Sequence, residues 1–157
     1  MIYIRTADFD DITVIKQLLE ESDLKPEGIE DYISNCMIAL DNRTPIAAAG
    51  FIKNKNIALI QFVAVKKTRQ REYVGDGILK ALLNFAETKG IRDVFVIAKK
   101  ELASFFRKVG FKEASPNQIN IAVEGFRICP KEENDRWLHV ALPDFFKNAC
   151  RAKQHQS

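Results

Sequence analysis

The spacing of apolar residues near the N-terminus predicts a strand followed by a helix. Residues 2–5 form a short run with β-branched and aromatic side chains, whereas the apolar residues of 12–19 stand three and four positions apart. Carboxylates at Asp8, Asp10 and Asp11 come just before that helix, where they can accept hydrogen bonds from its first amides.

Three apolar runs follow, and each predicts a strand. They span residues 36–40, 46–52 and 57–65, and the first two form a hairpin across a polar turn. Ahead of them, Pro26 stands at the first position of a short predicted helix that reaches Ile33. In residues 57–65, β-branched and aromatic side chains occupy both alternating faces, which indicates a strand that is covered on both sides.

The period of the pattern then changes, and residues 57–97 predict a strand, a loop, a helix and a second strand. Ile78, Leu82 and Ala86 stand four apart on one helical face, and Gly90 ends the helix. The apolar run 94–97 is the second strand. Two strands joined through a helix run parallel, with a right-handed crossover. We therefore expect one central parallel pair in a mixed, mostly antiparallel sheet with flanking helices.

The rest of the chain predicts a helix at residues 101–109 and a final strand at 136–142. Residues 115–123 leave the prediction open, because their Ser-Pro-Asn start suits a helix or a loop, whereas the alternating apolar residues after it suit a strand. No linker, repeat or low-complexity tract interrupts the sequence. We expect a single α/β domain over residues 1–150 and a frayed tail at 151–157.

Composition limits the class of protein. The 157 residues are 46% hydrophobic and 29% charged, as in one soluble globular domain. The net charge of +3 is too small to drive binding to nucleic acid or anionic lipid by itself. The three cysteines lie far apart without metal-ligand spacing, so we expect free thiols, no metal site and a cytoplasmic location. We expect neither a secretory signal nor a membrane span, which needs about 20 apolar residues.

The segment with the most chemistry is the loop between the strand at 57–65 and the helix that follows it. Four of the six residues 66–71 are basic, and Gly75 and Gly77 stand at the start of the helix. The first amides of a helix lack intrahelical acceptors, the helix dipole is positive there, and glycine lets a phosphate approach the backbone. Taken alone, the loop fits either an anion site or a solvated turn in which Asp76 caps the helix.

Together with its surroundings, this loop resembles the GNAT superfamily of N-acetyltransferases. Members carry a strand, a loop of the form Arg/Gln-x-x-Gly-x-Gly/Ala that opens a helix, a parallel strand, and a helix ending in a Tyr-x-x-x-Gly-Phe-like sequence. Residues 75–83 are similar to the loop and helix, and residues 106–111 are similar to the later helix end. The resemblance covers residues 1–112 in element order. The segment 116–130 also resembles a branch that acetylates amino-acid-like amines, including arsinothricin acetyltransferases and relatives of N-acetylglutamate synthase.

The resemblance implies acetyl-CoA as co-substrate, held at two places. The pyrophosphate is implied to lie on backbone amides at the start of the helix, and the pantetheine arm along the preceding strand. The residues are Val74, Gly75, Asp76, Gly77, Ile78 and Leu79 for the first place, and Val63, Ala64 and Val65 for the second. In the family, a free strand N–H polarises the thioester carbonyl, and a donor of this kind contributes roughly 3 kcal/mol. A primary amine then attacks directly, after a base or a water chain has removed its proton.

The sequence departs from the family pattern at three positions. Val74 stands where Arg or Gln is usual, and Leu79 stands where a small residue is usual. Phe106 stands where many members have the tyrosine that protonates the leaving thiolate, and a phenyl ring cannot donate a proton. The basic loop is also longer than usual, so Arg69 or Arg71 is a candidate to supply the missing charge.

No residue stands out as the catalytic acid or base. Gln61 lies on the strand that often offers a carboxylate, but an amide cannot accept a proton at neutral pH. His139 fits a partly buried structural role, and His155 lies in the tail. Cys129 has no histidine or nucleophile elbow near it, and Trp137 fits the core.

We therefore expect an acetyl-CoA-dependent N-acetyltransferase that acts on the primary amine of a small molecule, without a nucleic-acid or membrane partner. A homodimer is compatible with the sequence. A GNAT-like module that binds CoA or acyl-CoA without turnover stays open, because Val74, Leu79 and Phe106 favour it. Nucleic-acid binding through residues 66–71 also stays open, although no aromatic residues are interleaved with the basic ones. Arg127 fits a surface position or a pairing with a substrate carboxylate.

Overall fold

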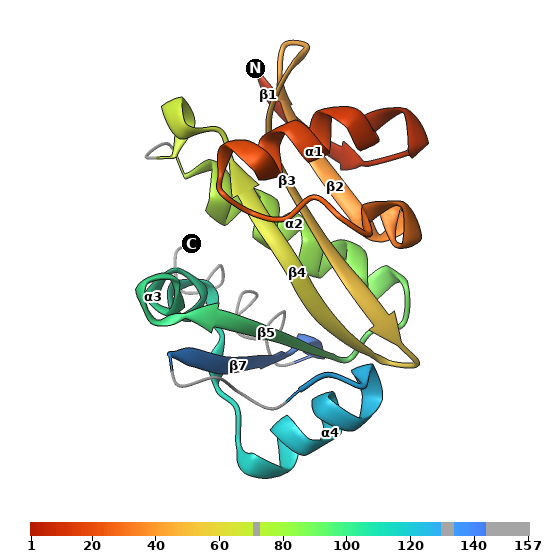
Figure 1. Cartoon of the computed structure of the whole chain (residues 1–157), viewed down its shortest axis with the longest axis vertical. Coiled ribbons are helices and arrows are strands. Elements are labelled where there is room, and N and C mark those ends of the chain that lie inside the picture. The colour runs from red at the N-terminus through yellow and green to blue at the C-terminus, as the bar shows by residue number, and fades with distance from the viewer. Residues whose placement is uncertain (71–72, 130–133, 144–157) are drawn as a thin grey trace, which may run out of the picture. The chain divides into compact units, whose positions relative to one another are not determined.

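The computed structural model describes residues 1–70, 73–129 and 134–143, and Figure 1 shows the order of their elements. The chain divides into two compact units. The first comprises Met1–Ile52 and Ile60–Ala86, and the second comprises Lys53–Leu59 and the residues from Glu87 onward.

The described residues form seven strands and four α-helices. The strands are hydrogen-bonded in the order β1-β2-β3-β4-β5-β7-β6, with one parallel pair in an otherwise antiparallel sheet. This confirms the expected mixed α/β fold. The strands are β1 (Ile2–Thr6), β2 (Cys36–Asp41), β3 (Thr44–Asn54), β4 (Ile57–Val65), β5 (Asp93–Lys99), β6 (Lys112–Glu113) and β7 (Asp135–Ala141), and the helices are α1 (Ile12–Glu21), α2 (Val74–Thr88), α3 (Lys100–Val109) and α4 (Pro116–Phe126).

In the first unit, α1 and α2 cover opposite faces of the strands, as Figure 1 shows. The β1–β2 and β2–β3 pairs are antiparallel, and Ile4 and Ala48 stand opposite Ala39 and Ile38 of β2. The apolar face of α1 is buried in the core of this unit, where Ile15 is completely inaccessible to solvent. Apolar residues three and four apart on α1 therefore fill one side of the sheet, as its spacing predicts.

The short helix expected from Pro26 to Ile33 is wrong. Two single-turn 3₁₀ helices, Ile29–Asp31 and Ile33–Asn35, take its place. Gly28 has a φ of +86°, in the left-handed region, and a right-handed helix cannot pass through that conformation.

In the second unit, β5 and β7 pair antiparallel along their whole length, from Asp93 opposite Ala141 to Lys99 opposite Asp135. Trp137 on β7 is buried, which confirms its expected place in the core. β6, only two residues long, was not predicted from the sequence and pairs with β7.

The segment that the sequence left open is the helix α4. Its first turn is closed by a capping box, in which the Ser115 hydroxyl accepts from the Gln118 amide and the Gln118 side chain accepts from the Ser115 amide. At its other end, the Asn54 side chain donates to the Gly125 carbonyl at 2.7 Å. The expected tail at 151–157 lies outside the described residues.

Candidate functional site

The predicted phosphate-binding segment lies in the first unit, where β4 leads through a basic loop into α2. The Lys66 amide donates to the Ile46 carbonyl at 2.8 Å, which continues the contact between β4 and β3 by one residue. A 3₁₀ turn, Lys67–Arg69, follows, and the Arg69 amide donates to the Lys66 carbonyl at 2.8 Å. The loop therefore leaves the sheet at a fixed point.

The start of α2 determines which backbone amides can meet an anion. The Gly77 amide donates to the Tyr73 carbonyl at 3.1 Å, so it is already used. The amides of Ile78 and Leu79 follow it inside the helix, where each has an acceptor four residues earlier. Of the predicted amide donors, Val74, Gly75 and Asp76 are those without an acceptor within the helix.

Gly77 has no structural need to be glycine. Its φ is not positive, and a Cβ added there would meet Ile4 Cδ1 at 4.0 Å, which is ordinary van der Waals contact. Glycine inside a helix costs about 1 kcal/mol relative to alanine. Packing therefore does not explain the glycine at position 77. Close approach of a ligand to the backbone is an explanation that fits.

The two loop residues that depart from the family pattern both pack inward. Leu79 is completely buried and Val74 is only 6% exposed. The larger side chain of Leu79 therefore fills the core instead of covering the first amides of α2.

Charges around the loop are partly neutralised within the first unit. Arg69 Nη1 donates to Asp41 Oδ2 at 2.9 Å. This contact, together with the Met1 ammonium, holds the pKa of Asp41 below its usual range. Asp76, in the first turn of α2, pairs with Lys80 at 2.9 Å, one turn later. Arg69 is thus engaged by Asp41, and Arg71 lies outside the described residues.

On β4, the predicted pantetheine strand has two distinct faces. Phe62 and Ala64 are buried, whereas Val63 and Val65 are half-buried and Gln61 is exposed. Val63 and Val65 therefore share the more accessible face of this strand.

Tyr73 is a feature that the sequence reasoning missed. Its ring is 86% exposed, and its φ of +61° is in the left-handed region, which is uncommon for an aromatic residue. An exposed aromatic ring can stack on a nucleobase. No spacing rule marks it, because a lone tyrosine in a polar loop carries no periodic signal.

In the second unit, Phe106 lies in an aromatic cluster. Its ring meets Phe111 edge-on, with the ring centroids 5.6 Å apart, and it is 6% exposed. The Phe111 amide donates to the Phe106 carbonyl at 3.1 Å, and Gly110 has a φ of +133°. The helix end predicted at residues 106–111 is therefore formed, with a buried phenyl ring at the position where the family often has a hydroxyl.

His139 is half-buried and held on both nitrogens. Its Nε2 is 2.8 Å from Asp93 Oδ1, and its Nδ1 is 3.3 Å from Gln118 Nε2. Neither partner was predicted, because strand register and helix docking bring them together from distant parts of the sequence. Cys129 and Arg127 are exposed, and Arg127 ends α4 in the left-handed conformation. Among the described residues, no three metal-ligating side chains gather as a metal site.

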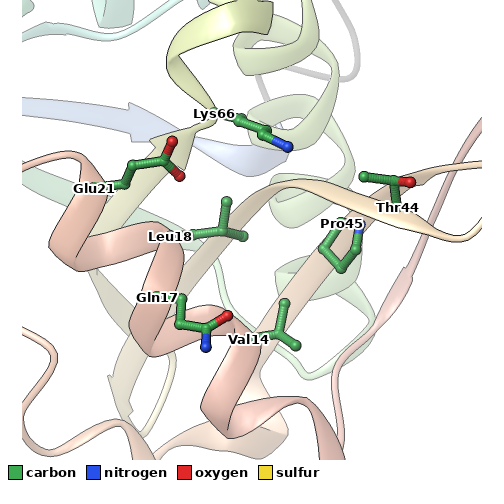
Figure 2. Close-up of a pocket in the computed structure, with 7 residues that line it drawn as sticks. All are labelled: Val14, Gln17, Leu18, Glu21, Thr44, Pro45 and Lys66. Atoms are coloured by element: carbon green, nitrogen blue, oxygen red, sulfur yellow. The ribbon is translucent and has the colours of Figure 1, made fainter.

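A pocket of about 220 Å³ opens in the first unit between α1, the start of β3 and the end of β4. Figure 2 shows Val14, Leu18 and Pro45 as its apolar part, with Glu21 and Lys66 bordering it near the end of the helix. Gln17 and Thr44 complete the lining. None of the described helices is long and apolar enough to cross a membrane.

Comparison with known proteins gives one family and a set of similar folds. A family model described as an acetyltransferase (GNAT) domain matches residues 10–130. A comparison with curated proteins gave no match.

Three solved structures represent the similar folds. N-acetylglutamate synthase from Neisseria gonorrhoeae, complexed with coenzyme A and N-acetyl-glutamate, is 22% identical at a TM-score of 0.75, and the match covers 90% of this chain but only 35% of that one. A GNAT-family acetyltransferase from Staphylococcus aureus is 18% identical, with 90% and 99% coverage and a TM-score of 0.70. The ribosomal-protein-S18-alanine N-acetyltransferase from Escherichia coli is 16% identical, with 90% and 94% coverage and a TM-score of 0.69.

Proposed function

Because this chain belongs to the GNAT acetyltransferase family, we propose that it transfers the acetyl group of acetyl-CoA to the primary amine of a small molecule. The nitrogen attacks the thioester carbonyl, the C–S bond breaks, and the products are an amide and CoA. The proton leaves the amine through a base or a water chain.

Gly77 is the observation that carries this proposal. Alanine would fit at that position without a clash, so packing does not explain a glycine that weakens the helix. Close approach of a diphosphate to the start of α2 does explain it. We assign the amides of Val74, Gly75 and Asp76 as its donors, with Gly77 providing the open surface beside them.

The rest of the CoA molecule has candidate contacts on neighbouring elements. The accessible face of β4, at Val63 and Val65, suits the pantetheine arm. The exposed ring of Tyr73 suits the adenine, with a contribution of about 1–3 kcal/mol for a stacked base. Arg71 is the remaining arginine candidate for the phosphates, and an unchanged CoA dissociation constant in Arg71→Ala would refute that role.

The test is a thiol-release assay with acetyl-CoA and a panel of amines. Release of CoA that depends on one class of small amine, with the N-acetyl product identified by mass spectrometry, supports the proposal. Release only with peptide or protein amines would assign a macromolecular acceptor. A protein that binds neither acetyl-CoA nor CoA would contradict the proposal.

The buried ring of Phe106 favours a second candidate, a module that binds acyl-CoA without turnover. A phenyl side chain cannot protonate a departing thiolate. Tight acetyl-CoA binding without CoA release across the whole amine panel would favour this candidate over the enzyme.

We place the protein in the cytoplasm as a single domain over residues 1–150. The three cysteines lie far apart in the sequence, as is typical of thiols in a reducing compartment. The small net charge of +3 supports neither a nucleic-acid nor a membrane partner.

A further inference from the structure

We propose that the pocket between α1, β3 and Lys66 binds a small zwitterion, an α-amino acid with an apolar side chain. This binding does not depend on the proposed acetyl transfer, because none of the residues that line the pocket is assigned to acetyl-CoA.

The size and lining of the pocket limit the ligand to a small amphiphilic molecule. About 220 Å³ is room for roughly seven water-sized volumes of 30 Å³ each. Val14, Leu18 and Pro45 form the apolar part, and Leu18 is only 5% exposed. A branched aliphatic side chain is the complement of that part.

The helix α1 makes one end of the pocket attractive to a cation. It ends in two consecutive glutamates, Glu20 and Glu21, and has no basic residue in its last turn. The C-terminal end of a helix is itself electronegative, so the dipole of α1 adds to these carboxylates. Of the two glutamates, Glu21 lines the pocket. An ammonium group placed there would offset an otherwise unfavourable concentration of negative charge.

Lys66 makes the same pocket attractive to an anion. Its backbone is fixed by the 2.8 Å hydrogen bond to Ile46, and the basic residues Lys67 and Arg69 follow it in the next turn. A carboxylate at the Lys66 ammonium would form a charge-assisted hydrogen bond. Figure 2 shows Lys66 and Glu21 at the same end of the pocket, with the Lys66 ammonium directed away from Glu21, so the two side chains do not pair with each other.

The polar groups of the lining are available for a ligand. Within the described part of the chain, the side chains of Gln17, Glu21, Thr44 and Lys66 form no hydrogen bond or ion pair with another residue. One free carboxylate, one free ammonium and two neutral hydrogen-bonding groups around an apolar floor match a zwitterion better than a purely anionic or cationic ligand.

Titration of the full-length protein with four probes tests the match, with backbone amide NMR shifts as the readout. L-leucine carries both charges and the aliphatic group. L-leucinamide lacks the carboxylate, 4-methylpentanoate lacks the ammonium, and glycine lacks the aliphatic group. We expect L-leucine to shift the amides of Val14, Leu18 and Thr44, and each of the other probes to bind about ten-fold more weakly. Equal affinities for the four probes, or no shift with any of them, would overturn the proposal.

Matched variants separate the pocket from the general charge of the surface. Glu21→Gln and Lys66→Met are expected to weaken L-leucine binding about ten-fold each. Glu20→Gln and Lys67→Met remove the same charges at neighbouring positions that do not line the pocket, and they should weaken binding much less than the pocket variants do. If the control variants weaken binding as much as the pocket variants, the site is elsewhere. Shifts at the pocket that follow protein concentration instead of L-leucine would assign the surface to a second copy of the chain and reject the amino acid.

The readout keeps this proposal distinct from the acetyltransferase assignment. Amide shifts require neither acetyl-CoA nor turnover, so a protein that fails the thiol-release assay can still bind L-leucine, and the reverse also holds.

Discussion

Gln118 fixes the tautomer of His139. The Oε1 atom of Gln118 accepts from the Ser115 amide at 2.9 Å in the capping box of α4, so its NH₂ group faces His139 Nδ1 at 3.3 Å. An NH₂ group can only donate, so Nδ1 must accept. The ring proton is therefore on Nε2, which donates to Asp93 Oδ1 at 2.8 Å.

This relationship predicts the position of the ring proton in the neutral form of His139. We expect an Nε2–H signature in ¹⁵N NMR, because Asp93 accepts from Nε2 and the NH₂ group of Gln118 donates to Nδ1. An Nδ1–H signature would contradict this assignment.

Gln118→Glu should place a proton on Nδ1 of His139. A glutamate keeps the capping box, and its second carboxylate oxygen can only accept, so Nδ1 must donate to it. The control is Asn117→Asp, which adds the same charge in the same helical turn at an exposed position and should leave the wild-type Nε2–H signature. The same ¹⁵N signature in Gln118→Glu and the wild type would contradict the tautomer assignment.

Asp11 predicts a loss of stability in acid. Arg5 makes two hydrogen bonds to this carboxylate, at 2.7 and 2.9 Å, and the Asp8 amide donates a third at 2.9 Å. The Arg5 hydrogen bond is the main reason that the pKa of Asp11 lies below its usual value of 3.8. Since the folded pKa is lowered, the stabilisation is present above the unfolded pKa and is lost as the pH falls below about 4 toward the folded pKa.

Asp11→Asn should lower the free energy of unfolding at pH 7 by about 2 kcal/mol, a value limited by the partial exposure of Arg5. Urea denaturation at pH 7 and pH 3 measures it, and the difference between variant and wild type should shrink in acid. Asp10→Asn, at an exposed neighbouring position, is the control and should change stability little. Equal losses in the two variants would argue against the ion pair.

Gly50 lies in a tightly packed part of the first unit. A Cβ at this position would lie 2.5 Å from Cys36 Sγ and 3.0 Å from a ring carbon of Phe62. Gly50→Ala should therefore destabilise the protein by about 2 kcal/mol. Adding Cys36→Ala removes the nearest atom, so the double variant should lose less than the sum of the two single losses in thermal denaturation. Additive losses would place the strain elsewhere.

Gly77→Ala should separate stability from ligand binding. Alanine fits there and favours the helix, so the free energy of unfolding should rise by about 1 kcal/mol. The added methyl group should weaken CoA binding about ten-fold, because it occupies the surface that a diphosphate approaches. Calorimetry with CoA measures the second effect. Asn84→Ala, on the exposed face of the same helix, should stabilise the protein without changing CoA affinity. A more stable Gly77→Ala with unchanged affinity would remove Gly77 from the site.

Most of the fold follows from periodic patterns in the sequence. The bounds of β4 coincide with the apolar run 57–65, α2 ends two residues before Gly90, and α3 ends directly before Gly110. The helix predicted to begin at Pro26 does not form because Gly28 has a left-handed backbone conformation. The sign of φ cannot be inferred from a hydrophobic pattern. The sequence left residues 115–123 open because their Ser-Pro-Asn start suits a helix or a loop, whereas their alternating apolar residues favour a strand.

The candidate site was harder to predict than the fold. The position of the loop is a local property, and the sequence places it at the start of α2. Which amides are already used depends on the Tyr73 carbonyl, and whether Arg69 is engaged depends on Asp41, 28 residues away. Contacts of this kind depend on strand register and loop conformation, for which the sequence carries no periodic signal.

The burial of the Leu79 side chain has a consequence for the recognition of distant homologues. A motif that requires a small residue at this position counts the leucine as a mismatch, although its side chain belongs to the interior of the first unit. A large residue on the buried face of α2 is therefore compatible with membership of the family, and a distant member can carry one there without matching the motif.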